Sequence, residues 1–185
     1  KQKTAYEILV GDWSSDVCSS DLRNFMKKIQ ESPKNDPHLG GHGFVTHLDV
    51  ALLNYFKNEL GCKSMLDIGC GPGGMVYEAN KLGYVSKGID GDYRLERKFP
   101  EMFILHDFTT GVCKIDETFD LGYSCEFVEH VEEKYVSNFL KVFKKCKYVA
   151  MTFAPPGTKG HSQCNKGCRG GYSIQLCNFL LHHLV

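Results

Sequence analysis

The stretch from Met65 to Met75, which reads MLDIGCGPGGM, constrains the fold of this chain more than any other. Apolar residues flank the acidic Asp67, and a run of glycines follows. A buried strand that ends in glycines can turn tightly into a helix whose N-terminus faces a ligand. The stretch therefore predicts a strand, a ligand-binding loop and a helix, in that order.

Apolar patterns that favour strands and helices alternate along the chain around this loop. We expect strands at residues 63–68, 84–89, 102–105, 120–124 and 147–153. We expect helices at residues 44–60, 73–82 and 127–145. Alternation of this kind predicts an α/β fold with a parallel sheet that helices cover on both faces. After Gly157 the alternation stops, and no further strand-helix-strand unit is visible.

Residues suited to binding a nucleoside follow the ends of these strands. In open α/β sheets, ligands bind at the carboxyl ends of the strands, near the point where the strand order reverses. Asp90 ends the second strand about 20 residues beyond the loop, where a carboxylate can bind two ribose hydroxyls. Asp107 and Phe108 follow the third strand and suit an adenine, because a carboxylate accepts a hydrogen bond from the exocyclic amine.

Together these motifs resemble those of the class I S-adenosylmethionine-dependent methyltransferases. The resemblance covers about residues 44–156, where LDIGCGPGG, GID, HDF and FDLGYSCEFVEHV stand in the order and at the spacing of that family. It implies a Rossmann-like, mainly parallel sheet. Dinucleotide-binding dehydrogenases share the fold logic, but their fingerprint is GxGxxG, whereas this loop reads DxGxGxGG. An NAD-type oxidoreductase is therefore the competing enzyme class.

The resemblance implies S-adenosylmethionine as the cofactor and assigns residues to it. Asp67 would orient the loop and the methionine ammonium, Asp90 would hold the ribose, and the Ser124 backbone would lie beside the methionine portion. The implied cofactor-binding set is Asp67, Gly69, Gly71, Gly73, Asp90, Asp107, Phe108 and Ser124.

Glu126, Glu129 and His130 are the predicted catalytic residues. At the start of a helix, positions i, i+3 and i+4 share one face, which here would point at the strand ends. Small-RNA 2′-O-methyltransferases and some quinone-pathway O-methyltransferases resemble this pattern, and they imply Mg²⁺ or another divalent cation with His161 as a further ligand. Two alternatives stay open: a metal-free base or substrate-binding role, and acids that only serve the helix dipole.

Two further groups of residues invite a functional interpretation. His42 precedes the helix that should cover the cofactor cleft, and it would contact cofactor or substrate or be merely solvated. A zinc site is disfavoured because the Cys-x3-Cys spacing is loose and no second pair follows cleanly. Its ligands would be His161, Cys164, Cys168 and Cys177.

The balance of charge and the cysteine count limit the partners and the compartment. The 22 basic and 22 acidic residues give no electrostatic argument for binding nucleic acid, and no apolar run is long enough to span a bilayer. Nine scattered cysteines indicate free thiols in a reducing cytoplasm. We therefore expect a cytoplasmic enzyme that methylates an oxygen of a small-molecule or sugar-like acceptor, with no nucleic-acid or membrane partner. An inactive cofactor-binding fragment is the non-enzyme alternative, and the oligomeric state stays open.

The two ends of the sequence do not fit the domain between them. Asp12 to Leu22 resembles an in-frame translation of a common sequencing-adapter oligonucleotide, so residues 1–22 are interpreted as extraneous. Residues 23–157 form the expected methyltransferase domain. Residues 158–185 are expected to be an irregular or truncated tail in which the C-terminal strands of the fold are missing or degraded.

Overall fold

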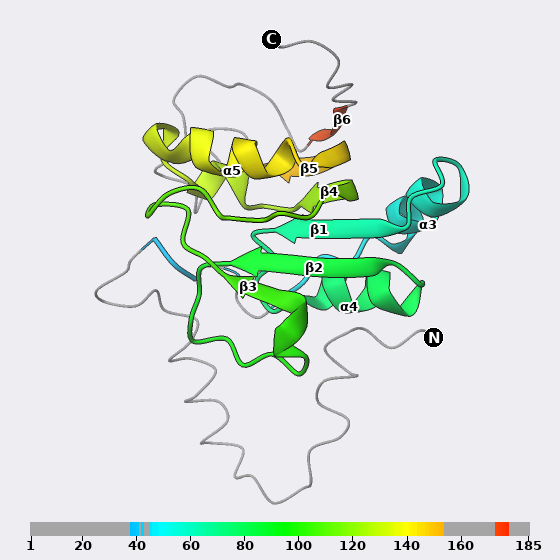
Figure 1. Cartoon of the computed structure of the whole chain (residues 1–185), viewed down its shortest axis with the longest axis horizontal. Helices are drawn as coiled ribbons and strands as arrows, with labels where there is room; N and C mark the ends of the chain where they lie inside the picture. The colour runs from blue at the N-terminus through cyan, green and yellow to red at the C-terminus, as the bar shows by residue number, and fades with distance from the viewer. Residues whose placement is uncertain (1–37, 41, 43–44, 154–172, 178–185) are drawn as a thin grey trace, which may run out of the picture.

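The structure, a computed structural model, describes residues 38–40, 42, 45–153 and 173–177 (Figure 1). These form one six-stranded sheet in the order β3-β2-β1-β4-β5-β6. The strands are β1 (Ser64–Ile68), β2 (Val85–Asp90), β3 (Phe103–Leu105), β4 (Phe119–Ser124), β5 (Cys146–Phe153) and β6 (Ser173–Cys177). The first five run parallel, and β6 is antiparallel to β5. The sheet has the predicted Rossmann-like, mainly parallel architecture.

Strand β1 lies at the centre of the sheet between β2 and β4. Asp67 near its end is level with Gly88 of β2 and with Tyr123 of β4. The carboxyl ends of these strands therefore meet at one edge of the sheet. The chain order reverses on either side of β1, which is the place where an α/β sheet binds its ligand.

Helices cover both faces of the sheet. Helices α3 (Val50–Asn58) and α4 (Gly74–Lys81) share a buried apolar cluster with Met65 and Leu121, whereas α5 (Val136–Phe143) shares the other cluster with Leu66 and Ile68. Neighbouring residues of β1 thus point to opposite faces, as strand geometry requires. Both clusters contain residues of the predicted strands β1, β4 and β5.

The predicted helix at 127–145 is wrong in its first half. Two single 3-10 turns, Val128–His130 and Glu133–Tyr135, precede α5. Val131 between them has extended backbone angles, which interrupts any helix. Phe127, Val128 and Val131 still pack on the core, so the apolar spacing that suggested a helix arises here from an irregular segment.

The predicted helix at 44–60 is also shorter in the structure. Asp49 caps α3, because its Oδ1 accepts a hydrogen bond of 2.9 Å from the backbone nitrogen of Leu52. Such a cap satisfies an otherwise unpaired donor and fixes where a helix begins.

Strand β6 lies in the tail where the C-terminal strands of the fold were expected to be missing or degraded, so at least one strand is present there. It pairs along β5 from Ser173 opposite Phe153 to Cys177 opposite Val149 (Figure 1). Five residues with alternating polar and apolar side chains are too short a signal to distinguish from a loop. The adapter-like segment, His161, Cys164 and Cys168 lie outside the described residues.

The structure also bears on the state of the cysteines and on membrane-spanning helices. The five cysteines whose side chains are described, Cys62, Cys70, Cys113, Cys125 and Cys146, are free thiols. In the described part of the chain, no helix has the length and apolar character needed to cross a membrane.

Candidate functional site

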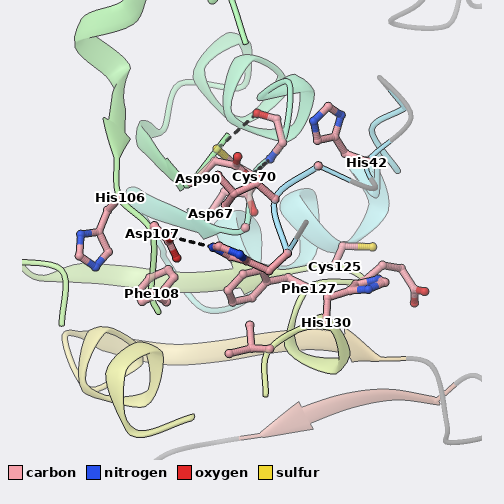
Figure 2. A pocket seen from close by; sticks show the side chains of 18 of the residues that line it. His42, Asp67, Cys70, Asp90, His106, Asp107, Phe108, Cys125, Phe127 and His130 are labelled. Atoms are coloured by element: carbon pink, nitrogen blue, oxygen red, sulfur yellow. Dashed lines mark hydrogen bonds and ion pairs between the residues drawn. The ribbon is translucent and has the colours of Figure 1, made fainter. Parts of the chain in front are cut away.

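A cavity of about 780 Å³ lies at the carboxyl ends of the strands (Figure 2). Its lining comes from the glycine loop after β1, the segments that follow β2, β3 and β4, and the segment before α3. Eight of the predicted site residues line it: Asp67, Gly69, Gly71, Asp90, Asp107, Phe108, Glu126 and His130. Gly73, Ser124 and Glu129 do not line it.

The glycine loop is packed closely by other parts of the chain. Gly69 has a φ of 77°, and a Cβ placed on it would lie 2.3 Å from Cγ of Phe127. Gly73 has a φ of 86° and caps α4, with the ring of Phe103 where its Cβ would be. Gly73 therefore serves the turn into α4, whereas Gly69 permits the approach of an aromatic ring at the cavity wall.

Asp90 fastens the loop to the end of β2. Its Oδ2 accepts a hydrogen bond of 2.8 Å from the backbone nitrogen of Gly71, and its Oδ1 accepts one of 2.8 Å from the backbone nitrogen of Asp92. The carboxylate still borders the cavity (Figure 2). Asp90 thus shapes the loop as well as facing the ligand space.

Asp67 is a buried carboxyl group in the cavity wall, with 3% of its surface exposed. Burial and the nearby charge of Asp90 raise its pKa to about 8. A buried carboxyl beside a second one favours a cationic ligand, because such a ligand restores the ionised form of both groups.

Asp107 interacts with His38, a contact that the sequence did not predict. Nε2 of His38 lies 2.8 Å from its Oδ2, and the backbone nitrogen of Thr109 donates to its Oδ1 at 2.8 Å. Burial opposes ionisation of Asp107, but these hydrogen bonds outweigh it and lower its pKa. Phe108 is buried beside Phe127, with ring centroids 5.7 Å apart, and forms an apolar wall.

His42 lines the cavity and is held by an acidic residue outside it. Its Nε2 lies 3.1 Å from Oδ2 of Asp92, which is 1% exposed and also pairs with Arg94 at 2.6 Å. Burial opposes ionisation of Asp92, but the hydrogen bonds from Arg94 and His42 lower its pKa to about 2. This places His42 against Gly71 in the structure, rather than leaving it solvated.

Ser124 has a structural role. It is fully buried, and its Oγ donates a hydrogen bond of 2.8 Å to the carbonyl oxygen of Ile68, which links β4 to β1. Its neighbours Tyr123 and Cys125 line the cavity instead. Oγ1 of Thr152 donates to the Cys125 sulfur at 3.2 Å.

The predicted arrangement of Glu126, Glu129 and His130 on one helix face is wrong. Glu126 has a φ of 52° and precedes the 3-10 turn, because the chain bends sharply after β4. Glu129 is buried, while His130 is exposed and lines the cavity. Among the described residues, no group of three or more His, Cys, Asp or Glu side chains could hold a metal ion. The described residues therefore do not support the divalent cation that the resemblance implied, and His161, its further expected ligand, lies outside them.

Comparison with known proteins gives matches among solved structures only. No family model matches the sequence, and a search of curated proteins finds no match. The methyltransferase domain of bacterial CtHen1 aligns with a TM-score of 0.46 and 22% identity, over 57% of this chain and 63% of that one. The plantazolicin methyltransferase BpumL in complex with SAH aligns with a TM-score of 0.44 and 16% identity, over 56% and 44%.

A third structural neighbour is a TehB-like SAM-dependent methyltransferase from Corynebacterium glutamicum ATCC 13032. It aligns with a TM-score of 0.45 and 24% identity, over 51% of this chain and 56% of that one. The chain thus spans less than two thirds of each of these three neighbours. They are methyltransferases, the class that the sequence motifs resemble, and at these identities the likeness is one of fold alone.

Proposed function

We propose that this chain binds S-adenosylmethionine and transfers its methyl group to an oxygen of a small-molecule or sugar-like acceptor. One observation carries the proposal. The glycine loop and the three acids that end or follow successive strands, Asp67, Asp90 and Asp107, border a single cavity. The structure of BpumL contains SAH, the demethylated form of this cofactor.

The charge of the cavity supports a cationic cofactor. Its lining contains five carboxyl groups and, among the residues that the structure describes, neither lysine nor arginine; the carboxyl groups belong to Asp67, Asp90, Asp107, Glu126 and Glu132. S-adenosylmethionine carries a sulfonium and an ammonium group, which such a lining attracts. The pyrophosphate of NAD would bring negative charge to the same acids, which disfavours the oxidoreductase alternative.

The size of the cavity fits a cofactor together with a small acceptor. Ligand pockets have volumes of about 300–1,000 Å³, and this one, at about 780 Å³, lies in the upper part of that range. An acceptor rich in phosphate would meet the same carboxyl groups. We therefore propose an uncharged hydroxyl-bearing acceptor rather than a nucleic acid.

Different residues of the cavity would bind the cofactor and act on the acceptor. S-adenosylmethionine supplies a methyl group that is already activated on its sulfonium, so the protein mainly aligns the acceptor and excludes water. Asp67 would bind the ammonium, Asp90 the ribose hydroxyls and Asp107 the adenine amine. Glu126 and His130 border the cavity after β4, where a carboxylate or imidazole can orient a hydroxyl and take its proton.

Ligand-induced stabilisation tests the proposal. S-adenosylhomocysteine at about 100 times its Kd should stabilise the folded chain by about 2.7 kcal/mol. Asp90→Ala should remove this effect, because it deletes the predicted ribose ligand and the anchor of Gly71. Asp116→Ala, which changes an exposed carboxylate outside the cavity lining, is the matched control and should keep the stabilisation. Equal stabilisation of the two variants would contradict the assigned role of Asp90.

A further inference from the structure

Arg97 is a buried cation in the segment between β2 and β3. Its side chain is 7% exposed, although arginine is almost never buried without partners. The sequence marks it only as part of a short polar stretch, residues 92–98. It does not line the cavity, so its burial needs another explanation.

The guanidinium of Arg97 is held by three contacts around the glycine loop. Nη2 donates a hydrogen bond of 2.9 Å to the carbonyl oxygen of Gly71 and lies 3.7 Å from Oδ1 of Asp90. The guanidinium carbon lies 4.9 Å from the centre of the Phe103 ring, a cation–π distance. That ring is the one that packs against Gly73.

Gly71 is consequently fixed at both of its backbone polar groups. Its N–H donates to Asp90 and its carbonyl accepts from Arg97. Because Arg97 also lies beside Asp90, the acid, the glycine and the arginine form a closed set of contacts. A hydrogen bond to a charged group is stronger than one between neutral groups, so this set holds the peptide on either side of Gly71 firmly.

Three titratable groups of the described residues interact with Arg97: Asp90 on β2, Cys70 in the loop and Tyr77 on α4. The charge of Asp90 in turn acts on the buried carboxyl group of Asp67 and contributes to its raised pKa. Arg97 thus places a positive charge directly behind the acidic wall of the cavity.

We propose that Arg97 is a positioning residue of the cofactor site, which fixes the Gly71 peptide and balances the charge of Asp90 without touching the ligand. This rests on the proposed function for the identity of the ligand. The loop-fixing part stands on the contacts alone and can be tested without any ligand.

Hydrogen exchange of the ligand-free full chain tests the loop-fixing role. In R97M the backbone amides of residues 69–71 and 73–75 should exchange about tenfold faster, the effect of losing a charge-assisted hydrogen bond. K98M removes a neighbouring exposed lysine whose charge lies over Phe99, and it should leave these amides unchanged. Equal exchange of these amides in R97M and in the unaltered chain would overturn the proposal.

Calorimetric titration with S-adenosylhomocysteine tests the effect on the site. R97M should bind about tenfold more weakly, and its affinity should fall further at pH 6 than at pH 8, because carboxyl groups that lose a nearby cation take up protons more easily. R97K keeps the charge and should keep the pH profile of the unaltered chain with a smaller loss of affinity. A merely structural role would not separate the two variants by pH.

The outcomes distinguish this inference from the proposed function. If R97M binds within twofold of the unaltered chain at both pH values, Arg97 does not position the site. If R97M does not fold, a changed pH profile in R97K overturns the charge-balancing role. If the unaltered chain does not bind S-adenosylhomocysteine, the proposed function fails, while the exchange rates still decide whether Arg97 fixes the loop.

Discussion

Two carboxyl groups set the electrostatics of the cavity at the scale of single residues. Asp67 is buried and close to Asp90, whereas Asp90 is engaged by the backbone of Gly71 and Asp92. Isolated buried charges are costly, so Asp67 takes up a proton that a cationic ligand would displace. The proposed function therefore predicts that cofactor binding is linked to the protonation of Asp67.

The pH dependence of binding follows from the raised pKa of Asp67. That pKa is about 8, so the neutral carboxyl dominates below pH 8 and the carboxylate above it. Affinity for S-adenosylhomocysteine, which keeps the ammonium group, should rise between pH 6 and pH 8.5. Asp67→Asn should bind more weakly at pH 8.5 and lose most of this rise, as calorimetry can measure. A rise of the same size in the variant would assign it to another group.

Gly69 in the glycine loop and Gly61 before β1 both have left-handed backbone, but they predict unequal costs of adding a methyl group. Gly69→Ala should cost about 1–2 kcal/mol for the left-handed backbone and about 1–3 kcal/mol more for overlap with Phe127. Gly61→Ala is the matched control, because its φ is 67° but nothing lies within 4 Å of the new Cβ. Denaturant unfolding should show the larger loss of unfolding free energy for Gly69→Ala. Equal losses in the two variants would mean that the Phe127 side chain moves aside at no cost.

At the scale of elements, the sequence predicted the strands better than the helices. Each parallel strand lies within one residue of its predicted bounds, because apolar residues and a turn signal after them mark it even where polar residues interrupt the run, as in β2. The first half of the helix expected after β4 is wrong because Phe127, Val128 and Val131 pack on the core from a single 3-10 turn and the residues on either side of it. Apolar spacing records which side chains are buried, and irregular backbone can bury the same set.

The start of α3 offers a test at this scale. Asp49 accepts from the backbone nitrogen of Leu52, and loss of such a cap costs about 1 kcal/mol. Asp49→Ala should lower the free energy of unfolding by that amount, whereas Asp49→Asn should keep most of it. Thermal unfolding followed by circular dichroism measures both. No difference between the two variants would show that the cap does not determine where α3 begins.

For the whole molecule, the motifs predicted the sheet and eight of the residues that line the cavity. They could do so because the polar residues of each motif lie at or near the end of a strand, and the ends of parallel strands meet at one edge of the sheet. The side-chain contacts could not be predicted from the sequence, because the partners are far apart in it. His38 and Asp107 are 69 positions apart, and Arg97 and Gly71 are 26 positions apart. Overall charge was uninformative as well, since a chain with 22 basic and 22 acidic residues still has an acidic cavity. Such local separation of charge depends on folding and cannot be read from composition.

Calorimetric titration of the full chain with S-adenosylhomocysteine and, separately, with NAD at pH 8 tests the central claim most directly. The glycine loop predicts a ligand site at the strand ends, and the acids there, together with the absence of lysine and arginine from the described cavity lining, predict a ligand with a cationic group. The account predicts saturable heat with S-adenosylhomocysteine at one site per chain and none with NAD. No heat with S-adenosylhomocysteine, or saturable heat with NAD alone, would contradict it.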